Sequence, residues 1–336
     1  MREKIHIGLV TAMAFLFLAS VSGYAAEKIV IKGTSVQMPN QSMGEALLEA
    51  KKRIEARLPG QVEMKAYPSA QLYTQTEEIT ALSRGEIQMA SVIGTGSLPV
   101  VSPVFQLIEL PGLFPNRDVF RKALQGPVGK ELWGEAEKKN IKVLSFWNAG
   151  KTQISNRKRV EIKLPKDAAG LKIRPAGKTY AAILESWGAM SVNVASEEQY
   201  SALQQGVIDG MLTATRIIHE RKLYENLTNL TDLEYLVLRA NALLVNKKWW
   251  DALPADVQKV ISAVGAEVAE LMIDVVNRDE VEAATAIAAS GTKVYQIPEK
   301  DYRIWQESAR KVWPKLIGKG GQTWVDKLAQ AADKTR

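Results

Sequence analysis

Residues 28–93 have the sequence KIVIKGTSVQMPNQSMGEALLEAKKRIEARLPGQVEMKAYPSAQLYTQTEEITALSRGEIQMASVI, and this stretch decides the fold. Some of its segments alternate polar and apolar side chains, as half-buried strands do, and others place apolar side chains at helical spacing. The strands expected on this basis are 28–32, 61–67 and 87–93, and the helices are 43–57 and 76–84. Strands and helices that alternate in this way predict a parallel sheet covered by helices, which is the α/β fold class.

A second series of strands and helices follows further along the chain. It starts at Gly170 and ends at Asp209-Gly210, and Ala149-Gly150 precedes it as a candidate boundary. The expected strands are 170–174 and 190–195, and the expected helices are 178–187 and 197–205. A chain of 336 residues corresponds to about two domains at roughly 150 residues each. The sequence therefore predicts two α/β domains.

Two further segments are suited to connect these domains. Residues 233–246 are apolar enough for a strand that passes between two sheets. Pro254–Ala289 has apolar side chains at helical spacing, and about 35 residues of helix reach on the order of 50 Å. We expect residues 26–148 plus about 239–279 to form the first domain. The second would comprise residues 149–238 plus about 280–336.

The N-terminus has the order of segments found in secretory signal peptides. Arg2 and Lys4 precede the apolar run Ile7–Val21, and small residues follow at 22–26. The run is short for a membrane-spanning helix, which needs about 20 apolar residues. We therefore expect a signal peptide at 1–25, cleaved after Ala25, and export to the periplasm of a Gram-negative bacterium. The alternative is an uncleaved membrane anchor.

Composition excludes several classes of chemistry. The chain has no cysteine, so it has neither disulfides nor thiolate ligands, and its two histidines cannot form a histidine cluster. The tripeptide Gly150-Lys151-Thr152 lacks the upstream glycine of a phosphate-binding loop. The formal net charge of +7 suits a small anion, an anionic membrane surface or nucleic acid, and export argues against nucleic acid. We expect no cofactor, no metal and no catalytic residue.

Arg174 is the residue that the local pattern singles out. In Leu171–Pro175, alternation places Leu171 and Ile173 on one face, and Arg174 ends the strand before a proline. Ligands of open α/β folds bind outside the carboxyl ends of strands. An arginine there can hold a carboxylate or sulfonate with two parallel hydrogen bonds. The alternative is that Arg174 is one of several basic side chains on a solvated face.

Several segments together resemble the periplasmic solute-binding proteins of TRAP transporters, the DctP-type family. Each is weakly specific, but their order and spacing cover essentially the whole mature chain. The segments are Tyr67–Leu72, Leu82–Ile87, Glu109–Phe114, Ala169–Pro175, Glu198–Gly210 and Leu253–Ile261. The resemblance implies the type II-like fold of periplasmic binding proteins, with two α/β domains, crossing hinge strands, one long domain-spanning helix and an organic anion in the cleft.

The resemblance also implies binding residues. The arginine that clamps the ligand's carboxylate in this family falls on Arg174, and a second basic position falls on Lys151, where the family often has arginine. A position usually occupied by asparagine falls on Thr213. The family's other cleft-lining positions fall on Ser35, Gln75, Thr95 and Trp147. Because a lysine is a point charge rather than a fork, Lys151 beside Arg174 would suit a compact carboxylate or a small sulfonate.

These expectations define a binding protein rather than an enzyme. The ligand would be a small organic anion, either a carboxylate or a sulfonate, and the partner would be a TRAP-type membrane permease. We expect a monomer that does not bind nucleic acid. The alternatives are a periplasmic enzyme acting on an organic acid and a ligand-presenting partner of a sensor.

Overall fold

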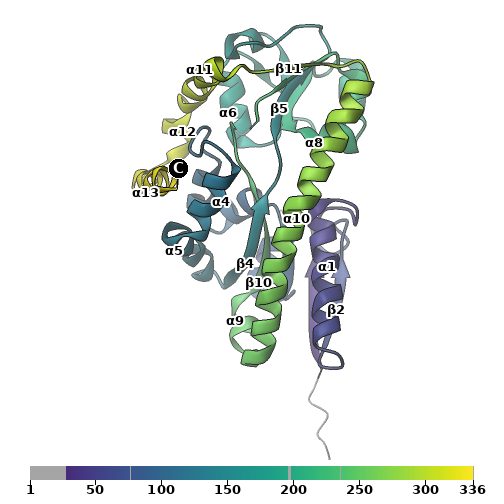
Figure 1. The fold of residues 1–336 in the computed structure, drawn as a ribbon, viewed down its shortest axis with the longest axis vertical. Helices are drawn as coiled ribbons and strands as arrows, with labels where there is room; N and C mark the ends of the chain where they lie inside the picture. The colour runs from purple at the N-terminus through teal and green to yellow at the C-terminus, as the bar shows by residue number, and fades with distance from the viewer. Residues whose placement is uncertain (1–27, 76, 196–197, 235, 336) are drawn as a thin grey trace, which may run out of the picture.

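The chain folds around two separate β-sheets that one long helix spans (Figure 1). The computed structural model describes residues 28–75, 77–195, 198–234 and 236–335. The expected signal peptide at 1–25 lies outside the described residues. The expected α/β class is confirmed, because each sheet contains parallel strand pairs and packs against helices.

The first sheet has five strands in the order β2-β1-β3-β10-β4. Strand β1 pairs in parallel with β2 and β3, as residues 28–93 predicted, and β10 lies antiparallel between β3 and β4. The bounds are β1 (Ile29–Thr34), β2 (Val62–Tyr67), β3 (Met89–Val92), β4 (Ile141–Asn148) and β10 (Ala240–Asn246).

The second sheet has six strands in the order β11-β9-β5-β8-β6-β7. Strand β6 pairs in parallel with β7 and β8, whereas β5 is antiparallel to both β8 and β9. The bounds are β5 (Thr152–Asn156), β6 (Lys172–Pro175), β7 (Met190–Ser191), β8 (Gly210–Ala214), β9 (Asn229–Asp232) and β11 (Lys293–Gln296).

The helices cover both faces of the first sheet. One face packs against α1 and α10, the other packs against α4 and α5, and the C-terminal helix α13 packs against those last two helices. The bounds are α1 (Ser42–Arg57), α2 (Glu78–Arg84), α3 (Gly94–Ser97), α4 (Arg117–Gln125), α5 (Pro127–Glu137), α6 (Lys178–Ser186), α7 (Gln199–Gln205), α8 (Thr215–Glu220), α9 (Lys247–Asp251), α10 (Ala255–Ala289), α11 (Glu299–Arg310), α12 (Trp313–Ile317) and α13 (Gln322–Lys334).

Two strand-to-strand connections cross between the sheets. Strand β4 of the first sheet leads directly into β5 of the second, and β9 of the second leads back to β10 of the first. Residues 233–246 were expected to form one strand, but only 240–246 do so. Residues 236–238 are buried in the connection because they pack into the cores of both domains.

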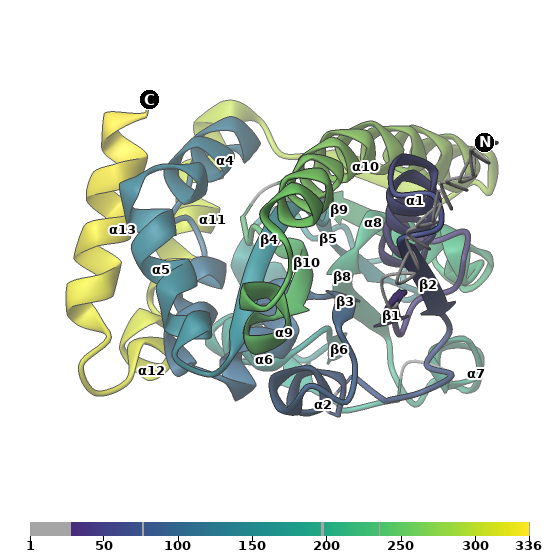
Figure 2. The same ribbon diagram turned by 90° about the horizontal axis from the view of Figure 1, so that it is seen from below.

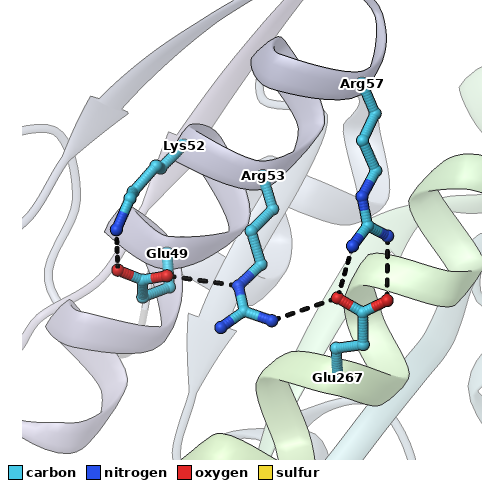
Figure 3. Close-up of polar contacts among 5 residues, drawn as sticks. All are labelled: Glu49, Lys52, Arg53, Arg57 and Glu267. Carbon is cyan, nitrogen blue, oxygen red and sulfur yellow. Dashed lines mark hydrogen bonds and ion pairs between the residues drawn. The ribbon is translucent and has the colours of Figure 1, made fainter.

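Helix α10 is the third connection. It starts directly after Pro254, has 35 residues, and contacts α1 and β4 at one end and α8 of the other domain (Figure 1). Ion pairs fasten it to α1: Glu267 accepts from both Arg53 and Arg57, at 3.0 and 2.7 Å (Figure 3). The crossing strands and the long helix are thus present as expected.

The C-terminal helices return to the first domain, which the expected boundaries did not include. Helix α11 packs against α6, but α13 packs against α4 and α5 on their side away from the first sheet, where Val325 and Leu328 join the first domain's core (Figure 2). The packing therefore divides residues 280–336 between the domains instead of assigning them all to the second.

Two features are absent from the described residues. No helix in them combines the length and apolar character that a bilayer span requires. They also contain no group of three or more histidine, aspartate or glutamate side chains arranged to hold a metal ion.

Candidate functional site

A cavity of about 320 Å³ lies between the two domains, and Arg174 is part of its wall. Both domains and the crossing segments contribute to it. Its lining consists of Val36, Gln37, Gln41, Met43, Gln75, Ile93, Ala149, Gly150, Thr152, Arg174, Ala176, Gln199, Thr213, Ala214, Arg216, Ile217, Arg221, Arg239 and Asn241.

Strand β6 positions Arg174. Its neighbour Ile173 is fully buried in the second domain's core, so alternation turns Arg174 to the other face. The backbone is fixed by Asp209, whose carboxylate accepts from the Lys172 amide at 2.9 Å. Arg174 Nε donates to the Val194 carbonyl at 3.3 Å. Burial lowers the pKa of Arg174, and the positive charges of Arg221 and Arg239 lower it further.

Three more arginines line the cavity, and the sequence analysis missed them. Arg216 lies on α8 and Arg221 follows that helix, while Arg239 precedes β10. Among the described lining residues there are four arginines and no aspartate or glutamate. The wall is therefore strongly cationic, and its charges face a space large enough for a small anion.

Carboxylates behind the wall hold two of these arginines. Arg239 Nε donates to Glu109 at 3.1 Å, and its guanidinium lies 5.8 Å from the centre of the Tyr180 ring. Burial alone would lower the pKa of Arg239, but Glu109 and Tyr180 outweigh it and raise the pKa. Arg216 donates to Glu220 at 2.7 Å. These contacts fix the two guanidinium groups before any ligand arrives.

Two buried polar atoms of the lining have no hydrogen-bond partner among the residues that the structure describes. They are Gln199 Oε1 and Arg216 Nε, on residues with exposed fractions of 2% and 6%. Burying such groups without a partner costs free energy. A polar ligand or ordered water in the cavity would provide the missing partners.

The structure brings only some of the expected site residues together. Arg174, Gln75 and Thr213 line the cavity. Ser35 is fully buried next to the lining residue Val36, and its hydroxyl accepts from the Gln37 amide at 3.3 Å. Thr95 lies in the short helix α3.

Lys151 and Trp147 do not belong to the lining. The Lys151 ammonium lies 3.6 Å from Asp232 and 3.8 Å from Glu234. Trp147 is 1% exposed and packs into the core shared with α1 and α10. The cationic partners of Arg174 in the wall are therefore arginines and not Lys151.

A sequence signal for Arg216 and Arg221 did exist. Strand β8 runs parallel to β6, so both strands end at the same edge of the sheet, and the two arginines follow β8. The rule that selected Arg174 applies equally to them. No comparable signal marked Arg239, because it lies in the connection that was expected to be strand.

A larger groove of about 690 Å³ lies elsewhere, between α10 and the pair α4 and α5. It belongs to the first domain, and Arg174 is not part of it. Its floor is apolar, and the rim residue Arg53 is paired with Glu267 (Figure 3). The cavity between the domains is the better anion site, since its cations converge on one enclosed space.

Known proteins resemble this chain over most of its length. Residues 33–319 match the family described as bacterial extracellular solute-binding protein, family 7 (DctP). A C4-dicarboxylate-binding periplasmic protein, DctP of Rhodobacter capsulatus, is 30% identical over 308 residues, which cover 91% of each chain.

Solved structures match the whole architecture. A TRAP periplasmic solute-binding protein from Ochrobactrum anthropi superimposes with a TM-score of 0.84 at 22% identity, over 91% of this chain and 95% of that one. Another, from Sulfurospirillum deleyianum with bound succinate, has a TM-score of 0.77 at 28% identity, over 90% and 98% of the two chains. The expected two-domain type II-like fold is confirmed.

Proposed function

Because the chain belongs to family 7 of the bacterial extracellular solute-binding proteins, we propose that it captures a small organic anion in the cavity between its domains and delivers it to the membrane subunits of a TRAP transporter. The family serves solute transport and is not a family of enzymes. The periplasm is the proposed location, supported by the N-terminal sequence and by the periplasmic relative.

The observation that carries the proposal is the charge of the wall. Arg174, Arg216, Arg221 and Arg239 meet at one cavity whose described lining contains no carboxylate. An anion in this space would form charge-assisted hydrogen bonds, which are stronger than neutral ones. The surrounding low dielectric would strengthen them further.

Proposed roles follow from position. Arg174 would grip the acid group with its planar fork, and Gln75 and Asn241 would contact the ligand from the first domain. Thr213 and Gln199 would contact it from the second. Closure of the domains would exclude water, and the ligand would favour the closed state through contacts made only there.

The number of arginines in the wall supports a ligand that carries more than one acidic group. One relative is named for C4-dicarboxylates and one solved structure contains succinate. We propose compact dicarboxylates as the first ligands to test, with keto acids, sugar acids and sulfonates beside them.

A titration of purified protein tests the function. The protein would first be unfolded and refolded to remove any ligand that it carries from the host. Isothermal calorimetry with each class of anion is expected to show saturable binding for one class. Absence of binding for every anion to correctly refolded protein would contradict the proposal.

A further inference from the structure

One side-chain contact joins the two domains beside the cavity. Gln41 directly precedes α1 in the first domain, and its Nε2 donates to Glu220 Oε2 at 2.6 Å. Glu220 is the last residue of α8 in the second domain. Gln41 Oε1 accepts from the Met38 amide at 3.1 Å, which fixes the orientation of the Gln41 amide.

The same carboxylate holds one of the cavity's arginines. Arg216 Nη1 donates to Glu220 Oε1 at 2.7 Å, so each oxygen of Glu220 receives a donor from a different domain. The three residues are shielded from water: Gln41 is 7% exposed and Arg216 is 6% exposed, and the Glu220 side chain is 17% exposed. Charge-assisted hydrogen bonds are strong in such surroundings.

We propose that Glu220 is a positioning residue that couples closure of the domains to the arginine wall. This inference rests on the proposed function, because it assigns a role at the same cavity. Closure brings Gln41 to Glu220, and Glu220 with both oxygens engaged holds Arg216 in the wall. Opening removes the Gln41 donor and leaves the carboxylate to Arg216 alone.

The coupling has a thermodynamic consequence. The Gln41–Glu220 contact exists only while the domains are together, so it stabilises the closed state even without a ligand. The Arg216–Glu220 pair lies within α8 in both states, and closure adds a second donor that holds the Glu220 carboxylate more firmly. A ligand that contacts Arg216 in the closed state therefore loses less of its binding free energy to ordering that side chain than it would in the open state. Removing Gln41 should therefore shift the protein towards the open state and speed ligand release.

Two variants test this coupling. Gln41→Leu keeps a similar side-chain volume but removes both hydrogen bonds of the amide. Glu220→Leu keeps a similar side-chain volume and removes both acceptor oxygens. Gln322→Leu is the matched control, since it removes a glutamine that donates to Asp326 at 2.8 Å within the single helix α13.

The chain contains no cysteine, so spin labels can be placed without removing native thiols. Arg84→Cys on α2 and Gln205→Cys on α7 put labels on exposed sites of opposite domains (Figure 2). Distance distributions between the labels report the closed and open populations of ligand-free, refolded protein. The midpoint of urea unfolding is measured in parallel.

In ligand-free protein, Gln41→Leu is expected to lower the ratio of closed to open molecules about tenfold. In the Glu220→Leu background the same change should lower it less than about twofold, since the acceptor has gone. Gln322→Leu should leave the distances unchanged. Unchanged distances in Gln41→Leu, or an equal effect in both backgrounds, would overturn the inference, even if the unfolding midpoint fell.

Succinate is the probe for the ligand-bound state. Where it binds, its dissociation from Gln41→Leu is expected to be about tenfold faster than from the parent protein. Failure of every anion to bind would contradict the proposed function but would not alter the distance measurements. The two claims therefore fail separately.

Discussion

Arg174 is the residue on which the proposed anion site most depends. Its guanidinium lies at the end of β6 within reach of the charges of Arg221 and Arg239, and this repulsion is relieved when an anion binds. Arg174→Ala is expected to weaken anion binding by at least about a hundredfold, and Arg174→Lys by less, because lysine keeps the charge but loses the fork. Calorimetry on refolded protein measures both.

The matched control for Arg174 is Arg303→Ala. Arg303 lies on α11 with 83% of its side chain exposed, and it forms an ion pair with Glu307. Its removal should leave anion affinity unchanged. Equal affinity in Arg174→Ala and the parent protein would remove Arg174 from the site.

Glu78 gives a prediction about stability and pH. The side chain is fully buried, with one oxygen 3.2 Å from the Ser97 hydroxyl. Burial raises the pKa of Glu78 to about 8, and the Ser97 hydroxyl opposes this only in part. The folded protein therefore keeps a proton that the unfolded chain releases near pH 4.5. The contribution of protonated Glu78 to the free energy of unfolding is fully present below pH 4.5, and it falls as the pH rises towards 8.

Glu78→Gln should remove this dependence. Between about pH 5.5 and pH 7.5 the parent protein is expected to lose on the order of 2 kcal/mol that the variant keeps. Urea unfolding at both pH values measures the difference. Parallel pH profiles for the two proteins would show that Glu78 is already ionised in the fold.

At the residue scale, prediction from sequence succeeded where strand alternation determines the face of the sheet on which a side chain lies. Arg174 was identified because Ile173 had to face the core. Lys151 was expected in the wall, but it is not among the lining residues, and its ammonium pairs with Asp232 and Glu234, which are distant in sequence. Arg239 depends on contacts with Glu109 and Tyr180, residues that are distant in sequence, so no local pattern could mark it.

At the element scale, Gly210 explains part of the motif that ends in Asp209-Gly210. It begins β8, next to Ser155 of β5, and a Cβ at this position would lie 1.7 Å from the Ser155 carbonyl oxygen. A backbone carbonyl in a paired strand cannot move aside cheaply. Gly210→Ala is expected to destabilise the fold by about 3 kcal/mol or more, measured by urea unfolding.

Gly134→Ala is the control for this prediction. Gly134 lies in α5, and a Cβ there would meet no atom within 4 Å. Alanine favours helix over glycine, so this variant should be as stable as the parent or more stable by about 0.5–1 kcal/mol. If both variants behaved alike, close packing at Gly210 would not be the reason for the glycine.

The elements that could be predicted are those in which apolar side chains recur at a regular strand or helix spacing. The first three strands and α1, α2 and α10 lie close to their expected positions, since one apolar face defines each of them. The segment before β10 was mistaken for strand because it is largely apolar. Its apolar side chains pack into the cores of both domains, and local sequence cannot distinguish that role from a strand.

At the scale of the whole molecule, two crossing segments and α10 join the domains, and the proposed closure would bend these connections. The C-terminal return of α13 to the first domain was not expected, because its assignment depends on packing against α4 and α5 and not on any feature of its own sequence. The family's motifs, by contrast, follow one another in order over almost the whole chain, and the fold could be predicted from them.

The measurement that tests the central claim most directly is a thermal-shift and calorimetric titration of refolded mature protein against dicarboxylates, keto acids, sugar acids and sulfonates. One class is expected to stabilise the protein by about 2.7 kcal/mol at a concentration a hundred times its Kd. Arg174→Ala should abolish that stabilisation. Folded protein that no anion stabilises, or an equal effect in the parent and in Arg174→Ala, would contradict the assignment of the arginine-lined cavity as the binding site.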